Sequence, residues 1–380
     1  MKQTIQICFL ITATLSISCQ QGALINVSLK DNMEKVIESE FKLYNMPGLA
    51  VLSVKGDSII YEDARGYADV HQKKLFTPQT RMLIASISKT MAVTAIMQLY
   101  EKGLVGLDED ISKYLPFQVR NPRFPNDVIT VKMLLTHSSS ISDDGYYSSV
   151  FYLYGYVDYP QSLIDFEKGY LTSGGQYYNG DKSFSQNKPG ASYLYSNVGA
   201  ALLACLVEYI TGTDYNSYCK ANIFEPLGMT RTTWLFSETP RSEVAIPYVS
   251  TDNTTPSNPF YVYPTYPDGH LMTTVEDLSK FMRAYIMNGA FNNYQLLKST
   301  TIDTILQTYG TIPDIGEQGL IFFKHTLGKF EVWGHDGGDP GVSTEMYFDR
   351  ESKIGYLMFN NRTEAYSEPI GDALLLYANQ

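Results

Sequence analysis

Cysteine and tryptophan are scarce in this chain of 380 residues, which holds 4 cysteines and 2 tryptophans. The cysteines lack the close spacing of zinc ligands, and the 5 histidines form no His-Glu-x-x-His pair. We therefore expect neither a metal site nor a cofactor. Cys205 and Cys219 each lie in a helical pattern, and we expect two buried free thiols there, although an exported protein can form a disulfide.

Basic residues are also few. There are 29 Lys and Arg against 40 Asp and Glu, so the formal net charge is -11, and no basic cluster occurs. Proteins bind nucleic acid mainly by neutralising phosphates with such side chains, so the composition argues against a nucleic-acid partner. The hydrophobic fraction of 44% is that of a globular protein with a substantial core.

Long hydrophobic runs are absent after the first residues. An apolar stretch over residues 5–17 is shorter than the roughly 20 residues of a membrane-spanning helix, so we expect residues 1–22 to be a secretory signal. The stretch leads into Cys19 in a pattern that resembles a bacterial lipoprotein cleavage site, with the aliphatic residue displaced by one position. Cleavage near Gly22-Ala23 without a lipid is the alternative. Either route exports the protein to the periplasm or cell envelope, and a lipid on Cys19 would anchor it to the membrane.

Apolar alternation predicts strands at both ends of the chain, and helical spacing predicts helices between them and at the two ends. The predicted strands cover residues 48–55, 58–65, 330–335, 342–348 and 353–360. The predicted helices cover residues 31–44, 131–136, 200–210, 215–224, 275–287 and 369–378. Asp336-Gly337-Gly338 is expected to be the turn after the third strand.

These elements indicate an α+β fold within a single domain over residues 23–380. One antiparallel sheet would be assembled from both chain ends, at about 30–80 and 290–380, and flanked by helices. A mainly helical lobe over about 81–289 would be inserted in it. A substrate cleft is expected between the two lobes.

A serine and a lysine three residues apart form the most informative motif, Ser86-Ile87-Ser88-Lys89. Apolar residues at helical spacing follow it up to Gly103, which predicts a buried helix with Ser86 at its amino end. Residues three apart share one face of a helix, so the Lys89 amine would lie beside the Ser86 hydroxyl and could activate it as a nucleophile. The amides at the helix end would stabilise a developing oxyanion.

The spacing alone is a weak signal, because serine and lysine are also three apart at Ser39, Ser185 and Ser217. Ser86 or Ser88 would moreover be an ordinary helix N-cap beside a solvated Lys89. Further motifs must decide between the structural and the chemical role.

Two later segments carry candidate site residues. Tyr195-Ser196-Asn197 precedes a strongly apolar helix, where the Tyr195 phenol and the Asn197 amide would face the cleft. The structural alternative is that Ser196 or Asn197 caps the helix. In the segment Trp333-Gly334-His335-Asp336-Gly337-Gly338, a strand ends in glycines that let backbone amides approach a ligand closely. Its alternative is an ordinary hairpin turn.

Together and in this order, Ser86-x-x-Lys89, Tyr195-x-Asn197 and His335-x-Gly337 resemble the three signature elements of the serine β-lactamase and penicillin-binding-protein superfamily. Within it, the chain is most similar to the class C β-lactamase, D-alanyl-D-alanine carboxypeptidase and esterase branch. The likeness runs from about Leu29 almost to the carboxyl end. It includes the segments 84–90, 133–139, 223–229 and 334–338.

The resemblance implies a role for each motif residue. Ser86 would attack a carbonyl, Lys89 and Tyr195 would accept and relay its proton, and water would hydrolyse the acyl-enzyme. The amides of Ser86 and Gly338 would form the oxyanion hole. The substrate-binding residues implied by the motifs are Asn197, His335, Gly337 and Gly338.

Two positions depart from the family pattern. Many efficient β-lactamases have lysine where this chain has His335, and a histidine is mostly neutral at pH 7, so we expect weak turnover of β-lactams. Family members with histidine are often esterases or peptidases. The second is Ser140, which stands where the family usually has glycine, so the conformation of that turn is open.

The implied function is that of an exported serine hydrolase that cleaves an ester or a D-residue peptide or amide, with weak or no β-lactamase activity. The rival interpretation is a non-catalytic sensor on the same scaffold that binds a peptide or cell-wall fragment. A Ser-His-Asp hydrolase is disfavoured because no Gly-x-Ser-x-Gly elbow occurs. Residues 146–178, rich in tyrosine and glycine, would form either a lid over the cleft or a surface loop packed by its own rings, and residues 261–270 would also shape the pocket.

Overall fold

The computed structural model describes residues 28–147, 151–249, 260–313 and 316–380. The expected secretory signal and Cys19 lie outside the described residues. Among the described residues, no helix is both long and apolar enough to cross a membrane.

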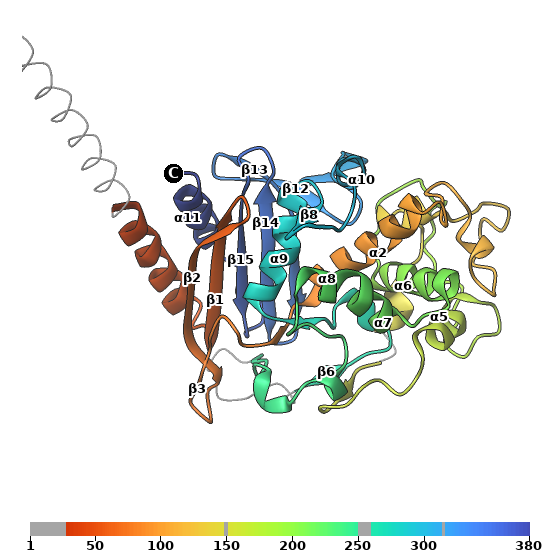
Figure 1. Cartoon of the computed structure of the whole chain (residues 1–380). Coiled ribbons are helices and arrows are strands. Elements are labelled where there is room, and N and C mark those ends of the chain that lie inside the picture. Colours follow the sequence, from red (N-terminus) through yellow and green to blue (C-terminus); the bar gives the residue numbers. More distant parts are fainter. Residues whose placement is uncertain (1–27, 148–150, 250–259, 314–315) are drawn as a thin grey trace, which may run out of the picture.

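A sheet of 9 strands, in the order β10-β11-β12-β13-β14-β15-β1-β2-β3, is the frame of the molecule (Figure 1). Its pairs are all antiparallel. The strands are β1 (Gly48–Lys55), β2 (Ser58–Asp69), β3 (Lys74–Leu75), β10 (Gly310–Ile312), β11 (Gly316–Gln318), β12 (Phe323–Leu327), β13 (Phe330–Asp339), β14 (Val342–Asp349) and β15 (Ile354–Asn360). Because β1 pairs with β15, the two chain ends build one sheet, which confirms the predicted α+β fold.

Strand β13 differs from the sequence prediction in a way that matters for the site. Asp336, Gly337 and Gly338 are not a turn but continue the strand, paired with Glu345, Thr344 and Ser343 of β14. The turn comes at Gly341, whose φ of 73° suits glycine. The glycines serve close packing instead, since a side chain at Gly337 would collide with the carbonyl oxygen of Ile84. Strands β3, β10, β11 and β12 of this sheet were not predicted.

Helices cover both faces of the sheet (Figure 1). The helix over residues 28–43 and α11 (Glu368–Ala378) bury one face, together with Val332, Tyr356 and Met358 of the sheet. On the other face lies the larger core, to which α2 (Lys89–Glu101) and α9 (Val275–Ile286) contribute. Although α9 falls in the range expected for the helical lobe, it packs directly on β1, β14 and β15.

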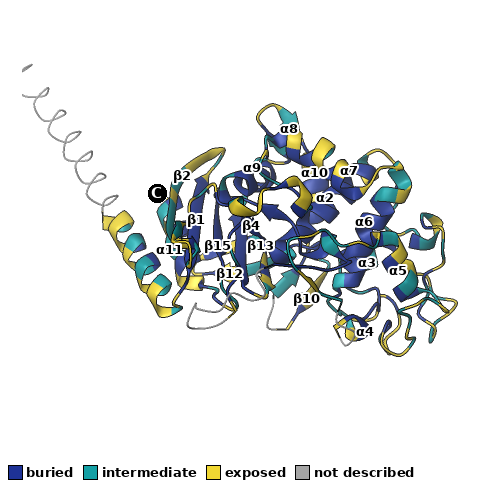
Figure 2. Cartoon of the chain, turned by 90° about the horizontal axis from the view of Figure 1, so that it is seen from below, coloured by how far each residue is buried: buried dark blue, intermediate teal, exposed yellow. Residues whose placement is uncertain are grey.

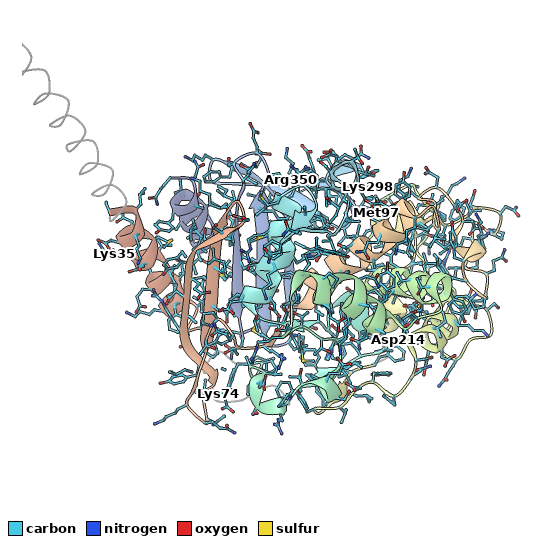
Figure 3. The ribbon with its side chains drawn as sticks, viewed as in Figure 1. Lys35, Lys74, Met97, Asp214, Lys298 and Arg350 are labelled. Carbon is cyan, nitrogen blue, oxygen red and sulfur yellow. The ribbon has the colours of Figure 1, made fainter. Side chains whose placement is uncertain are left out.

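Helices α2 and α6 (Asn197–Thr211) contact each other and lie almost wholly inside the protein (Figure 2). Four further helices contact one or both of them: α3 (Val131–Leu135), α5 (Leu163–Leu171), α7 (Tyr215–Cys219) and α10 (Ser299–Ile305). Two short helices are α4 (Asp144–Tyr147) and α8 (Glu225–Leu227). Short two-stranded ladders join β4 (Met82–Leu83) to β7 (Met272–Thr273), β5 (Leu153–Tyr154) to β6 (Tyr261–Val262), and β8 (Ala290–Phe291) to β9 (Tyr294–Gln295). Figure 3 contrasts buried Met97 of α2 with exposed Lys35 and Lys298.

Local signals explain where α6 begins and ends. The Ser196 side chain accepts a hydrogen bond from the Gly199 amide at 2.8 Å, which is a normal N-cap. Gly212 ends the helix in the left-handed conformation with φ 69°. Cys205 of α6 and Cys219 of α7 are buried and free, as expected.

Ser140 also adopts a left-handed backbone conformation, with φ 65°. A residue with a Cβ atom pays roughly 1 kcal/mol there, which explains a preference for glycine. The Ser140 hydroxyl accepts a hydrogen bond from Asn121 Nδ2 at 3.1 Å, an interaction that glycine could not make. The turn therefore keeps its conformation despite the substitution.

We predict that Gly337→Ala destabilises the protein. The added methyl group would meet the Ile84 carbonyl oxygen and the Thr344 hydroxyl, and overpacking of this kind costs about 1–3 kcal/mol. Thermal unfolding should show a clear drop in the transition temperature. Gly310→Ala is the matched control, because no atom lies within 4 Å of a Cβ at that position. Equal unfolding temperatures for the two variants would contradict the close approach of β13.

Candidate active site

Ser86 lies in a turn of 3-10 helix, Ala85–Ser88, that leads directly into α2. The α-helix therefore begins at Lys89, three residues after the predicted start at Ser86. Ala85 has a left-handed φ of 46°, a strained conformation that persists only where the surroundings fix it. The backbone at the serine is thus set by its packing.

Three hydrogen bonds fix this turn against the rest of the protein. The Ile84 amide donates to the Leu271 carbonyl at 3.0 Å, and the Thr344 hydroxyl donates to the Ile84 carbonyl at 2.8 Å. The Ser88 hydroxyl accepts from the Leu271 amide at 3.1 Å. Ser88 makes no side-chain capping bond to α2, so the capping alternative for it is wrong.

Lys89 is fully buried and its amine points at the serine. Its Nζ donates to Ser86 Oγ at 2.9 Å and to the Asp268 carbonyl at 2.6 Å, with Asp268 Oδ1 at 3.9 Å. Burial lowers the pKa of Lys89, while the charge of Asp268 acts in the opposite direction. The other lysines at this spacing, Lys42, Lys188 and Lys220, are exposed. Burial therefore singles out Ser86 and Lys89 as a pair able to act as nucleophile and base.

Tyr195 completes the contact around the amine. Lys89 Nζ lies 5.1 Å from the centroid of its ring, and the His137 ring packs on it with centroids 4.3 Å apart. Burial raises the pKa of Tyr195 well above its ordinary value, and a hydrogen bond with Ser86 works against that rise. The lowered pKa of Lys89 makes its neutral amine, the form that can accept a proton, more accessible, whereas the raised pKa of Tyr195 keeps the phenol neutral.

Asn197 is the first residue of α6 and lies at the rim of the same hollow. Its backbone amide donates to Asp143 Oδ2 at 2.6 Å, and its side-chain amide donates to the Tyr147 hydroxyl. Asp143 also accepts from the Ser196 hydroxyl at 2.8 Å and the Val198 amide at 3.2 Å. The aspartate thus holds the start of α6 and the asparagine with it.

The third motif divides between wall and support. Gly338 lines the cavity that contains Ser86, whereas Gly337 packs against the Ile84 carbonyl behind it. His335 is buried, its Nδ1 contacts the Asp336 carbonyl, and its Nε2 has no partner. Burial lowers the pKa of His335 to about 4, so the imidazole is neutral at physiological pH.

The cavity itself has a volume of about 370 Å³. Ser86, Tyr195, Asn197 and Gly338 line it, with Lys89 behind the serine; His335 and Gly337 are not among its lining residues. The lining residues that the sequence analysis did not single out are chiefly aspartates and tyrosines: Asp143, Asp144, Asp268, Asp339, Tyr146, Tyr147, Tyr152 and Tyr263. The tyrosine-rich stretch and the segment 261–270 supply most of them, and Asp339 directly follows the third motif.

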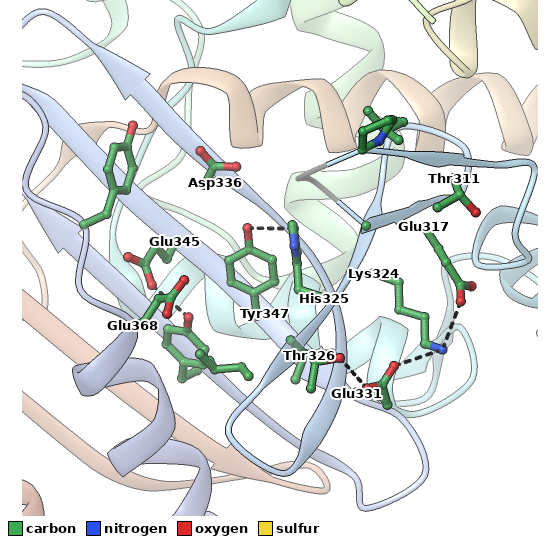
Figure 4. Close-up of a pocket in the computed structure, with 17 residues that line it drawn as sticks. Thr311, Glu317, Lys324, His325, Thr326, Glu331, Asp336, Glu345, Tyr347 and Glu368 are labelled. Atoms are coloured by element: carbon green, nitrogen blue, oxygen red, sulfur yellow. Dashed lines mark hydrogen bonds and ion pairs between the residues drawn. The ribbon is translucent and has the colours of Figure 1, made fainter.

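A larger cavity, about 710 Å³, lies beside strands β10 to β15 (Figure 4). Asp336, Glu345 and Tyr347 point into it, next to the face of the sheet that α11 covers. It includes none of the predicted site residues. The chemistry therefore belongs to the smaller cavity.

The comparison with known protein families agrees with this geometry. The family described as Beta-lactamase matches residues 33–379, nearly the whole described chain. The chain belongs to the Beta-lactamase family. Ser86 and Lys89 are arranged as in a β-lactamase-type serine hydrolase. The family resemblance that the motifs indicated is confirmed.

Curated relatives within the Beta-lactamase family have different lengths. Protein flp of Staphylococcus aureus (strain N315) is 27% identical over 256 residues, which are 67% of this chain and 48% of the relative. The chain thus spans about half the length of that relative. Penicillin-binding protein 4* of Bacillus subtilis (strain 168) is 25% identical over 367 residues, 90% of this chain and 75% of that protein.

A solved structure supports the fold of the Beta-lactamase family. The D-amino acid amidase of Ochrobactrum anthropi SV3, in complex with L-phenylalanine amide, superposes with a TM-score of 0.71. The match covers 92% of this chain and 98% of the amidase at 21% identity. At that identity the likeness speaks for the fold alone.

We predict that the rate of Ser86 acylation rises with pH along a limb centred below 10.5, the ordinary pKa of lysine, because burial lowers the pKa of Lys89. The rate of labelling by a fluorophosphonate, measured across pH, reports this limb. Tyr195→Phe should retain it, since the phenol ionises only at higher pH. A limb centred at 10.5 or above would show that the lysine is not perturbed.

Proposed function

We propose that the protein is an exported serine hydrolase that forms an acyl-enzyme on Ser86 and cleaves an ester or an amide, including peptides with a D-residue. The observation that carries this proposal is the buried Lys89 Nζ at 2.9 Å from Ser86 Oγ, at the wall of a cavity. A serine hydroxyl is a weak nucleophile until a neighbouring base takes its proton, and a buried amine whose pKa is lowered can be that base. The arrangement requires no group beyond these side chains.

The reaction follows from the placement of the protons. Ser86 Oγ forms a bond to the substrate carbonyl carbon while its proton passes to Lys89 Nζ. The carbon–nitrogen or carbon–oxygen bond then breaks, and the leaving amine or alcohol takes up a proton, relayed by the Tyr195 phenol. Water attacks the acyl-enzyme in the second half, releases the acid and returns the proton to Ser86.

The amides of Ser86 and Gly338 are proposed to hold the oxyanion. Both residues line the cavity, one at the start of α2 and the other on β13. Preorganised donors of this kind contribute roughly 3 kcal/mol each to the transition state. The packing of Gly337 against Ile84 supports their alignment, because it fixes β13 against the serine turn.

Weak or absent β-lactam turnover is part of the proposal. A β-lactam antibiotic carries a carboxylate, and a lysine at position 335 would attract it, whereas His335 is neutral and lies outside the cavity lining. The neutral state of His335 therefore favours amide or ester substrates without a carboxylate.

We predict that a fluorophosphonate or a fluorescent penicillin labels the protein but not Ser86→Ala. The nucleophilic oxygen is removed in that variant, so labelling should vanish. Ser217→Ala is the matched control, because Ser217 also precedes a lysine by three residues but is exposed, as is Lys220. Equal labelling of wild type and Ser86→Ala would end the proposal.

Turnover separates the hydrolase from a sensor on the same scaffold. A screen of short acyl esters, D-amino-acid amides and a chromogenic cephalosporin should give many product molecules per protein for some ester or amide. A sensor would bind ligand or acylate at most once.

Export with a lipid anchor at Cys19 is proposed from the sequence pattern. In a bacterial host, the full chain should then appear in the membrane fraction, and Cys19→Ser should release it. Membrane fractionation with an antibody measures this, with Cys219→Ser as control because that cysteine is buried in the domain. A wild-type chain found only in the soluble periplasmic fraction would favour cleavage near Gly22-Ala23 instead.

A further inference from the structure

The catalytic cavity is strongly acidic. Among its described lining residues are four aspartates, and none is a lysine, arginine or histidine. The nearest cation, Lys89, lies behind Ser86 and has its proton affinity lowered by burial. The cavity therefore favours a substrate that carries a positive charge or hydrogen-bond donors.

Two of the four aspartates are poor candidates for binding a substrate cation. Asp143 accepts three hydrogen bonds at the start of α6, from Asn197, Ser196 and Val198, so its carboxylate is fully used. Asp144 is exposed to solvent, where charges are screened. Asp268 and Asp339 remain.

Asp268 is buried and only partly satisfied. Its side chain is 8% exposed, and its Oδ1 lies 3.9 Å from Lys89 Nζ. Its Oδ2 has no hydrogen-bond partner although the residue lines the cavity. Burial raises the pKa of Asp268 to about 6, while Lys89 and the Thr265 hydroxyl act to lower it, so a further positive or donating group beside the carboxyl would stabilise its charged form.

Asp339 lines the same cavity and is bonded to two tyrosines. Its Oδ1 accepts from the Tyr152 hydroxyl and its Oδ2 from the Tyr263 hydroxyl, both at 3.2 Å. Burial, together with the negative charge of Asp268, raises the pKa of Asp339 to about 7. The two carboxylates thus repel each other, and a cation between them would relieve both.

We propose that Asp268 and Asp339 bind the free ammonium group of the substrate, so that the enzyme hydrolyses amides or esters of amino acids with an unblocked α-amino group. The inference rests on the proposed acyl-enzyme function. Asp339 directly follows Gly338, whose amide is the proposed oxyanion donor, and both residues line the cavity, so the carboxylate belongs to the same part of the wall as that donor. The same charges slow the reaction with substrates and probes that carry a carboxylate, penicillins included.

A matched pair of substrates tests the proposal. D-phenylalanine p-nitroanilide and its N-acetyl derivative differ at the amino group alone, which is a cation in the first and a neutral acetamide in the second, and the L-enantiomers form a second pair. Charge-assisted hydrogen bonds contribute roughly 1.5–3 kcal/mol. For at least one of the two enantiomers, kcat/KM for the free amine should therefore exceed kcat/KM for the N-acetyl compound by about tenfold or more. EDTA in the assay keeps metal ions from occupying the carboxylates.

Variants assign the preference to the two residues. Asp339→Asn and Asp268→Asn should each reduce the ratio of the two kcat/KM values toward one, whereas Asp144→Asn should keep it. The ratio is informative even for a partly destabilised variant, because loss of folded protein lowers both rates equally. The unfolding temperature of each variant is measured alongside.

The outcomes separate this inference from the proposed function. A wild type that hydrolyses a neutral short acyl ester through Ser86, but treats both p-nitroanilides alike or prefers the N-acetyl compound, overturns the ammonium site and leaves the hydrolase intact. A preference that survives in both aspartate variants also overturns it. A protein that is neither labelled at Ser86 nor active on any ester or amide overturns both.

Discussion

The buried amine of Lys89 is the constraint on which the rest of the site depends. Moving a charged ammonium from water into a protein costs several kcal/mol, so the group either finds compensation or loses its proton. Here the direct compensation comes from a hydroxyl, one backbone carbonyl, the Tyr195 ring and a carboxylate oxygen at 3.9 Å, and the charges of further aspartates add to it. That balance lowers the pKa of Lys89 without trapping the amine in a tight ion pair, as a general base requires.

The fold maintains that balance by holding the serine turn from several sides. Leu271 bonds to both sides of the turn, and Thr344 of β14 bonds to the carbonyl of Ile84. Strand β13 lies flat against the turn because Gly337 has no side chain. Strands from the carboxyl end of the chain therefore hold the turn that contains Ser86, which lies in the amino-terminal part of the sequence. The position of the nucleophile thus depends on both ends of the chain.

Local patterns were sufficient for the frame and for the motifs. The hairpin of β1 and β2, the helix ended by Gly212 and the strands β14 and β15 follow from alternation, helical spacing and turn residues, all of which act over a few residues. Asp336 to Gly338 failed for a specific reason: glycine usually marks a turn, but here tertiary packing requires it within a strand. No local pattern reports that a distant carbonyl lies against the chain.

The cavity wall was the least predictable part of the site. Asp268 and Asp339 have no characteristic spacing from each other or from Ser86, and an aspartate is ordinarily solvated. Their importance arises only from burial, which brings both into the cavity that contains the serine. Tyr152 and Tyr263 lie in the two segments that were expected to shape the pocket. Nothing in the sequence indicated that both of their hydroxyls donate to one carboxylate, that of Asp339.

Asp268 connects substrate binding to the base. Its Oδ1 faces Lys89 and its unpartnered Oδ2 belongs to a side chain at the cavity wall, so one carboxylate interacts with the catalytic amine and, in the proposed mode, with the substrate ammonium. Its negative charge raises the pKa of Lys89. A bound ammonium would offset that charge and lower the pKa of Lys89 further. Binding of the correct substrate would thus favour the neutral amine, and by reciprocity the neutral amine would favour binding of the ammonium.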